Sequence, residues 1–403
     1  MSTTVGQWRT GGAVAGGRSA GVEGSVADRS AAVAGEVAGR FADEVDARAR
    51  FPRETLAALA ASGVLGALVP RELGGEGADL TEACQSVLAV GRHCASSAMV
   101  LAMHHLQVAC LVRHCGGSPG VEGLLRRVAG EELLLASATS EVGIGGRMRQ
   151  SSCAVEPSGD GFTLVKQAPT VSYGAQADAV LVTARRTADS APGDQVLVAC
   201  VRPDVTLEQV TEWDTLGLRG TCSPGFVVRA QGSWDMVLPE PFADIAAATM
   251  LPYSHLLWSH VWLGIASAAT ARAGALVRRQ ARKDPGVTPP AARRLAELWV
   301  VLQQLEHLVT AAVARFDEDR DGHRADGLTD AVSLNGLKVG ASSLMVDVVG
   351  RALAICGMDG YRNGTPFSLG RHLRDAHGAV VMVSNDRILG DNAQMLLVAK
   401  EGV

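Results

Sequence analysis

The sequence lacks an excess of basic residues. Its 403 residues include 37 Lys and Arg against 42 Asp and Glu, which gives a formal net charge of -5 at pH 7. A surface that binds nucleic acid needs clustered Lys and Arg side chains to neutralise phosphates. The composition therefore argues against nucleic acid as a partner, while the hydrophobic content of 47% is sufficient for the core of a globular protein with two or three domains.

Closely spaced cysteine pairs and long apolar runs are also missing. The eight cysteines form no Cys-x-x-Cys pair, which favours reduced thiols over a zinc site or a disulfide framework, and we expect no metal site. Residues 1–25 hold no continuous apolar segment of the kind found in secretory signals, so we interpret them as a flexible tail. No run reaches the roughly 20 uninterrupted apolar residues of a membrane helix. These observations predict a cytoplasmic protein without membrane insertion.

Two nucleotide-binding motifs are absent as well. No Gly-x-Gly-x-x-Gly follows a predicted strand, and no P-loop occurs.

Residues 317–328 begin like a calcium loop, but Leu328 stands where that loop requires a bidentate Glu. We interpret this segment as a solvated connection between helices.

The hydrophobic pattern divides the chain into three parts. Residues 26–130 show helical spacing, with helices predicted over 52–63, 80–92 and 96–114. Residues 131–240 consist of short β-branched runs broken by turn residues, including a hairpin turn at 158–161. Residues 241–403 return to helical spacing. The order predicts an N-terminal helical domain, a middle β-domain of barrel or sandwich type and a C-terminal helical bundle.

One helix of the last part is especially regular. Its apolar residues recur every three or four positions, which suits packing against a neighbouring helix. They are Leu295, Leu298, Leu302, Leu305, Val309 and Ala312. A second long helix is predicted over 330–356, so the last part has the pattern of a bundle.

Five stretches give the chain a resemblance to a known family. They are "VPRELGGEGAD", "SATSEVGIGG", "WDTLGLRGT", "RRQARKDPG" and "ICGMDGYRNGTPFSLGRHLRD". Their order and spacing over residues 51–403 resemble the acyl-CoA dehydrogenase family. The resemblance implies a four-helix bundle as the C-terminal domain, a homodimer or homotetramer, and FAD between the β-domain and the bundle, completed by a neighbouring subunit.

The resemblance assigns flavin and substrate contacts to the β-domain. Thr139 and Ser140 keep hydroxyl donors of the family's "TEPGAGSD" stretch, Gly145 allows close approach of the backbone to the cofactor, and Gly146 replaces the family's Ser at a substrate contact. In "APTVSYG", Ser172 retains a hydroxyl for flavin N5. Thr170 replaces a Trp that stacks on the flavin, and Ala168 replaces a customary Lys.

Further cofactor contacts are implied in the bundle. Arg282 of "RKDPG" matches an Arg that reaches the FAD pyrophosphate across the dimer, a role suited to a guanidinium. Gly357 and Gly360 of "GMDGY" match a turn against the partner subunit's cofactor. Pro285 stands where the family has Phe, and Met358 where it has Gly. FAD is the expected cofactor.

The catalytic base of the family is missing from both of its usual positions. In the main branch a Glu lies about nine residues after the Arg374-Asp375 pair, which the resemblance implies is structural; the count gives Val383 here. In other branches the Glu lies on the first bundle helix, about ten residues before Gly264, where Ser254 stands as a substrate contact. Asp386 is the best-placed substitute base, with His255 next.

These features leave two reaction classes open. The first is α,β-dehydrogenation of a specialised acyl thioester, carried by coenzyme A or an acyl-carrier protein as in secondary metabolism, with an electron-transfer partner that reoxidises the flavin. The second is flavin-dependent hydroxylation of carbon or nitrogen by a monooxygenase of the same fold, which needs no base at that point. A non-catalytic flavin-fold protein is a third interpretation.

Overall fold

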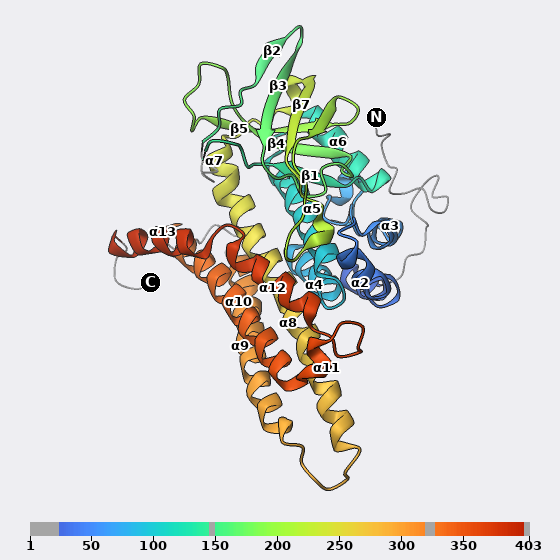
Figure 1. Cartoon of the computed structure of the whole chain (residues 1–403). Coiled ribbons are helices and arrows are strands. Elements are labelled where there is room, and N and C mark those ends of the chain that lie inside the picture. Colours follow the sequence, from blue (N-terminus) through green and yellow to red (C-terminus); the bar gives the residue numbers. More distant parts are fainter. Residues whose placement is uncertain (1–23, 145–149, 319–326, 399–403) are drawn as a thin grey trace.

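The computed structural model describes residues 24–144, 150–318 and 327–398. Within these residues, a helical block is followed by strands and then by long helices, as the hydrophobic pattern predicted (Figure 1). The N-terminal helices are α1 (Val26–Val33), a π-helical continuation (Ala34–Ala38), α2 (Gly39–Ala47), α3 (Arg53–Ala61), α4 (Leu80–Gly91), α5 (Ala95–His114) and α6 (Pro119–Glu131).

Local sequence sets where these helices begin and end. The Asp79 side chain caps α4 by accepting the Glu82 N–H at 2.9 Å. Helix α3 starts directly after Pro52 and is followed by Gly63 in a left-handed conformation (φ 68°). The three helices predicted in this part are confirmed to within one or two residues at each end.

The middle part contains two sheets. Strand β1 (Leu135–Ala138) runs parallel to β4 (Ala179–Arg185), which pairs with β5 (Gln195–Val201). The second sheet is antiparallel in the order β2 (Glu156–Ser158), β3 (Gly161–Ala168), β7 (Phe226–Ser233) and β6 (Val205–Gln209). Ser158 pairs with Gly161 across the predicted hairpin turn, which confirms it.

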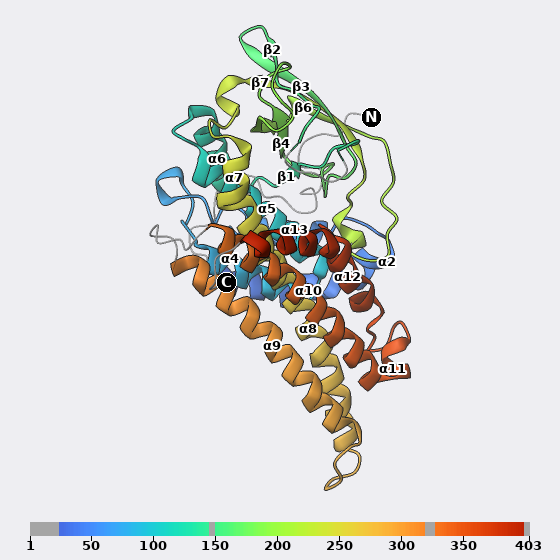
Figure 2. The same cartoon turned by 90° about the vertical axis from the view of Figure 1, so that its left-hand side faces the viewer.

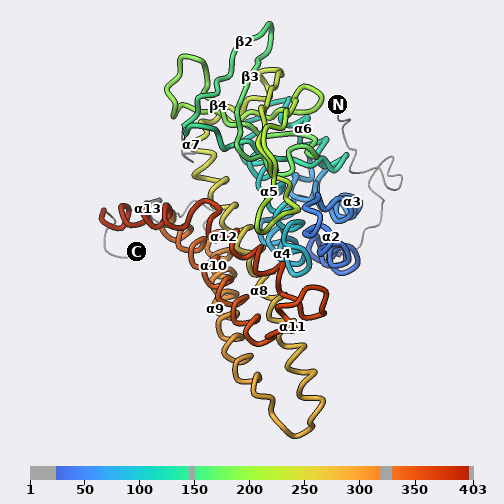
Figure 3. Tube along the Cα trace, viewed as in Figure 1, coloured from blue at the N-terminus to red at the C-terminus, as the bar shows by residue number. Residues whose placement is uncertain are grey.

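The long helices of the last part form a bundle below the sheets (Figure 2). They are α7 (Phe242–Ile245) with a π-helical continuation (Ala246–Met250), α8 (Leu251–Ala281), α9 (Ala291–Glu318), α10 (Gly327–Cys356), α11 (Met358–Tyr361), α12 (Gly370–Val381) and α13 (Asn385–Val398). The predicted apolar seam lies on α9, where Leu298, Leu305 and Val309 are fully buried. The trace in Figure 3 shows α13 leaving the bundle toward the C-terminus.

Close backbone approach joins the bundle to the N-terminal helices. Gly264 of α8 meets Gly91 at the end of α4, and a Cβ atom at Gly264 would lie 2.6 Å from the Gly91 carbonyl carbon. A larger side chain at Gly264 would therefore separate the two helices.

Two helices are long and apolar enough to cross a membrane by length and composition alone, although polar residues interrupt both of them. They span Ala95–His114 and Thr329–Cys356. The first of these is 89% buried inside the fold, and a core helix of that kind passes the same test of composition.

Charged residues of α12 connect all three parts of the chain. The Arg374 guanidinium pairs with the carboxylate of Asp46 on α2, and its Nη1 also donates to the Leu216 carbonyl oxygen. The buried Asp375 carboxylate accepts the Leu218 N–H at 2.7 Å, in the loop between β6 and β7. The structural role expected for the Arg374-Asp375 pair is thus confirmed.

Replacing Asp375 tests this connection. Burial raises the pKa of Asp375 from 3.8 to about 6, against the opposing charge of Arg371 and the Leu218 hydrogen bond. The native state therefore binds the proton more tightly than the unfolded state, so this group's contribution to stability falls as pH rises from about 4 to about 6. Chemical denaturation across this range should show that slope in the wild type and not in Asp375→Asn.

Asp375→Ala is the matched variant. It removes the acceptor of a buried N–H and should cost about 1–3 kcal/mol at pH 7, whereas Asn keeps an oxygen acceptor. Equal stability of the Ala and Asn variants would contradict the assigned role of this hydrogen bond.

Candidate functional site

A group of hydroxyls lies where the first and third strands of the β-domain end. Ser140 Oγ donates to the Thr170 carbonyl oxygen at 3.0 Å and lies 3.3 Å from Thr170 Oγ1. Thr139 lies next to β1, and its carbonyl oxygen accepts a bond of 3.5 Å from Thr183 Oγ1. The structure thus brings the predicted residues Ser140 and Thr170 into direct contact.

A buried tyrosine fixes the turn that carries these hydroxyls. Tyr173 has a positive φ of 42°, and its side-chain hydroxyl donates to the Leu135 carbonyl oxygen at 2.9 Å. Its backbone N–H bonds to the Thr221 carbonyl oxygen at 2.8 Å. Ser172, the residue before it, accepts a hydrogen bond of 2.9 Å from Ser223 Oγ. The hydroxyl of Thr170 stays exposed while the turn below it is rigidly held.

A buried ion pair supports the start of the glycine-rich stretch. Glu141 accepts hydrogen bonds from Ser151 Oγ at 2.6 Å and from the Ser152 N–H at 2.9 Å, and its Oε2 lies 3.4 Å from Lys166 Nζ. Burial alone would raise the pKa of Glu141, but these hydrogen bonds and the Lys166 charge lower it. Gly145 and Gly146, predicted to contact flavin and substrate, lie outside the described residues.

Sequence reasoning did not identify Lys166. On β3 the inward positions are Phe162, Leu164, Lys166 and Ala168, so a charged residue on the buried face was the available signal. The customary Lys that is absent at Ala168 has a counterpart two positions earlier on the same face of the strand.

The cofactor residues predicted in the bundle lie at the far end of α8. Arg282 follows the last residue of α8 and is exposed. Arg279 pairs with Asp359 at 2.8 Å, and this ion pair ties α11 to the same end of α8. Gly357 precedes α11 with a positive φ of 55°, and at Gly360 a Cβ atom would lie 2.5 Å from Cys356 Cβ. Figure 1 shows this end of the bundle far from the strands.

The turn between α12 and α13 holds no carboxylate at the predicted base position. Val383 and Ser384 both have positive φ (55° and 36°), and Val383 packs partly buried against the core. Asp386 is exposed in the first turn of α13, where a carboxylate interacts favourably with the helix N-terminus. The structure gives no contact between Asp386 and the hydroxyls of the β-domain.

The second base position lies on α8, deep in the bundle. Ser254 Oγ donates to the Leu251 carbonyl oxygen at 2.8 Å. His255 is 1% exposed, and its Nδ1 lies 3.1 Å from the Leu334 carbonyl oxygen on α10, so Nδ1 carries the proton. Burial lowers the pKa of His255 to about 4, and the imidazole is neutral at neutral pH.

The comparisons with known proteins match this architecture at both ends of the chain. Residues 25–132 match the model "Acyl-CoA dehydrogenase, N-terminal domain", and residues 245–382 match "Acyl-CoA dehydrogenase, C-terminal domain". Together they cover more than half of the sequence. This chain belongs to the acyl-CoA dehydrogenase family. It is therefore a flavoprotein of a family of oxidoreductases.

Relatives within the acyl-CoA dehydrogenase family differ in activity. Dibenzothiophene monooxygenase of Mycolicibacterium goodii is 28% identical and aligns with 75% of this chain and 77% of its own. The probable acyl-CoA dehydrogenase fadE25 of Mycobacterium leprae is 27% identical over 85% and 86%. A probable FMNH2-dependent monooxygenase, SfnC of Pseudomonas putida, is 24% identical over 81% and 84%.

Two solved structures superpose on nearly the whole of this chain. KijD3 in complex with dTDP superposes with a TM-score of 0.80 at 25% identity, covering 93% of this chain and 96% of that one. A glutaryl-coenzyme A dehydrogenase superposes with a TM-score of 0.77 at 20% identity, covering 93% and 95%. The second likeness concerns the fold.

The donors present suit the flavin of this family. Hydroxyls at Ser140, Thr170 and Ser172 offer both donors and acceptors, as the nitrogen and oxygen edge of an isoalloxazine ring requires. The exposed Arg282 suits a phosphate group. The end of α8, which Arg282 follows, lies far from the strands that precede the hydroxyls (Figure 1). One copy of the chain therefore does not bring Arg282 close to these hydroxyls.

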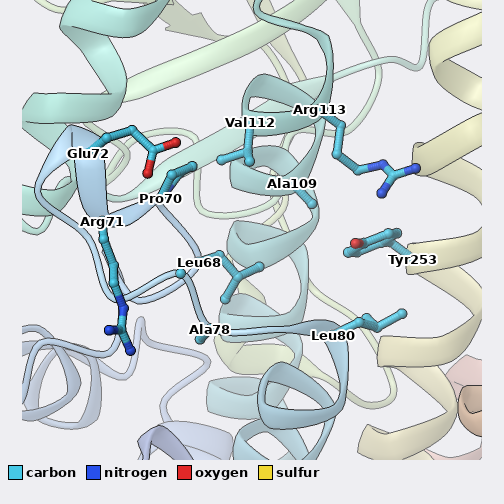
Figure 4. Close-up of a pocket in the computed structure, with 11 residues that line it drawn as sticks. Leu68, Pro70, Arg71, Glu72, Ala78, Leu80, Ala109, Val112, Arg113 and Tyr253 are labelled. Carbon is cyan, nitrogen blue, oxygen red and sulfur yellow. The ribbon is translucent and has the colours of Figure 1, made fainter. Parts of the chain in front are cut away.

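A cleft of about 380 Å³ lies away from these residues, between the loop before α4, helix α5 and the start of α8 (Figure 4). Arg113 reaches toward α8, donates to Thr249 Oγ1 at 3.0 Å and lies over the Tyr253 ring, 6.0 Å from its centroid. The lining consists of Leu68, Pro70, Arg71, Glu72, Gly77, Ala78, Leu80, Ala109, Val112, Arg113 and Tyr253. Of the predicted site residues that the structure describes, none lines this cleft.

The Glu141–Lys166 pair yields a stability prediction. Lys166→Met leaves a buried carboxylate without its cation and should lower the free energy of unfolding by about 3–5 kcal/mol. The double variant Glu141→Gln with Lys166→Met removes both charges and should lose less than the sum of the single variants. Urea denaturation of the four proteins measures the coupling, and strictly additive losses would show that the two charges do not interact.

Proposed function

We propose that this protein is a flavin-dependent monooxygenase that hydroxylates carbon or nitrogen of a small substrate. The main support for this proposal is that neither usual position of the family's catalytic base holds a carboxylate, because Val383 and Ser254 occupy these positions. The two substitute candidates add little support for proton abstraction. Asp386 is exposed, and His255 is a buried, neutral imidazole whose low pKa makes it a weak base.

The named activities of relatives support the same choice. Dibenzothiophene monooxygenase and the probable FMNH2-dependent monooxygenase align with this chain over most of their length. A reduced flavin supplies two electrons to O₂, so that one oxygen atom enters the substrate and the other leaves as water. The chain's own part is to bind and orient: hydroxyls at Ser140, Thr170 and Ser172 hold the flavin edge, and the bundle excludes water.

The cofactor proposed for this site is FAD shared between two copies of the chain. Arg282 of one copy would meet the pyrophosphate of the flavin held by the hydroxyls of another. Exposed apolar side chains on the bundle support such an assembly, because water contact is unfavourable for them. They include Trp299 (53% exposed), Leu396 (51%) and Leu397 (86%).

Dehydrogenation of a specialised acyl thioester is the second candidate. It is favoured by the similarity to the probable acyl-CoA dehydrogenase fadE25 of M. leprae, which aligns with 85% of this chain. The retained "GLRGT" stretch favours it as well. In that stretch Arg219 Nε donates to the Asp46 carbonyl oxygen of α2 at 3.0 Å. In that case the substrate would be carried by coenzyme A or an acyl-carrier protein, and an electron-transfer partner would reoxidise the flavin.

Anaerobic spectroscopy separates the two reactions. The purified protein, loaded with oxidised flavin, is titrated with straight-chain, branched and amino-substituted acyl-CoA thioesters. We expect no bleaching of the visible flavin band by any of them. After reduction by an external flavin reductase and admission of ¹⁸O₂, label should appear in a substrate drawn from a panel of small aromatic and amine compounds. Stoichiometric bleaching by a thioester alone would establish the dehydrogenase instead.

Asp386→Asn sharpens this test. Loss of a working general base costs on the order of 100-fold or more in rate. For the monooxygenase we expect the rate of label incorporation to remain within about twofold of the wild type, with flavin content retained. A loss of two orders of magnitude, in either reaction, would assign Asp386 to proton transfer.

Arg282→Ala tests the cofactor. Removing a guanidinium from a pyrophosphate should weaken FAD binding by about 2–3 kcal/mol and leave FMN, which has no pyrophosphate, nearly unchanged. Fluorescence titration of the apoprotein with each flavin measures both affinities. Equal small losses for FAD and FMN would place Arg282 away from the cofactor.

A further inference from the structure

A buried lysine lies beside the turn that replaces the family's base. Lys338 of α10 is fully buried, and its Nζ donates to the Ala379 carbonyl oxygen at 3.0 Å and to Asn385 Oδ1 at 2.5 Å. Ala379 belongs to the last turn of α12, and Asn385 is the first residue of α13. One amino group therefore bridges the two helix ends on either side of Val383.

Lys338 has no carboxylate partner in the part of the chain that the structure describes. The carbonyl groups at the C-terminal end of α12 carry partial negative charge, so they stabilise the charged amino group of Lys338. Lys338 Nζ also lies 5.9 Å from the Trp262 ring centroid on α8. Burying a lysine without a carboxylate partner lowers the stability of the folded state, so we expect Lys338 to have a role other than stabilising the core.

The turn that Lys338 bridges is strained. Val383 and Ser384 adopt positive φ values of 55° and 36°, which are unfavourable for side chains with a Cβ, and above all for the β-branched Val383. Such a conformation persists only where the surroundings hold it. Ser342 adds a second support from α10, because it accepts a hydrogen bond of 3.0 Å from Asn385 Nδ2.

We propose that Lys338 is a positioning residue: by joining the end of α12 to the start of α13, its amino group fixes the turn that presents Val383 to the substrate. The inference rests on the proposed function only in assigning the substrate to this turn. A sequence signal existed, since Lys338 is a single charge on the apolar face formed with Leu337, Ala341 and Met345.

The protonation of Lys338 provides a readout that does not depend on turnover. Burial lowers its pKa from 10.5 to about 8, and the nearby Arg387 charge of α13 acts in the same direction. On α8 the facing titratable group is His255, which is neutral above its own pKa of about 4. Above pH 8 the amine is neutral and donates more weakly, so the turn should loosen.

Hydrogen exchange of the amides in residues 379–388, corrected for intrinsic rates, tests the proposal in the flavin-loaded protein. In Lys338→Met we expect exchange faster on the order of tenfold, as for the loss of one or two hydrogen bonds. Wild-type protection should decline through about pH 8, and Asn385→Asp, which supplies a carboxylate, should move that decline to higher pH.

Asn392→Ala is the matched control, because it removes another buried contact between α10 and α13, the Asn335 to Asn392 hydrogen bond of 2.8 Å. It should loosen α13 without a change in the pH dependence at residues 379–388. Unchanged protection in Lys338→Met, or the same response in the control, would overturn the positioning role. If Lys338→Met folds poorly, an unchanged pH midpoint in Asn385→Asp overturns it alone.

Turnover then connects the turn to the reaction. With flavin content equal to that of the wild type, Lys338→Met should lower kcat/KM by about 10- to 100-fold, the size expected when a group that orients the substrate is displaced. Faster amide exchange in Lys338→Met with an unchanged kcat/KM would show that Lys338 contributes to stability and not to substrate positioning. Faster exchange in Lys338→Met, together with no ¹⁸O product from the wild type, would refute the proposed function and leave the structural role of Lys338 intact.

Discussion

The buried carboxylate of Asp375 is the constraint on which the arrangement of the three domains depends. It accepts the Leu218 N–H in the loop between β6 and β7, while the neighbouring Arg374 pairs with Asp46 of α2. The contact requires direct backbone approach: a Cβ atom at Gly217 would lie 2.1 Å from the Arg374 carbonyl oxygen. Helix α12 is thereby held against the β-domain and the N-terminal helices at once, and a site formed between domains keeps its geometry.

The same helix determines the turn beside the proposed site. Asp375 and Ala379 are one helical turn apart on α12. The same segment of α12 therefore bonds to Leu218 of the β-domain through Asp375 and to Lys338 through the Ala379 carbonyl oxygen. A displacement of α12 would therefore be felt both at Leu218 and at Val383. Rigid helices transmit such shifts because packed interiors have few voids in which to absorb them.

The fold could be predicted from the sequence because it depends on periodicity and order. Apolar spacing located α4, α5 and α9, and turn residues located the hairpin at Ser158 to Gly161. The supports of the site could not be predicted in this way. Lys166 and Glu141 are distant in sequence and meet because the backbone after Glu141 lies beside β3, where the Val142 N–H donates to the Gln167 carbonyl oxygen at 3.0 Å. Lys338 and Asn385 are 47 positions apart, and only the packing of α10 against the turn brings them together.

The chemical character of the turn follows from these supports. In the main branch of the family the resemblance implies an anionic Glu there, which takes a proton from carbon. Here an aliphatic Val383 occupies the position, and the buried charge behind it is the cation of Lys338. Val383 cannot accept a proton, and Lys338 bonds the ends of the two helices that flank it. A turn of this composition offers no base for proton abstraction, which supports the proposed monooxygenase, in which a reduced flavin would supply electrons to oxygen.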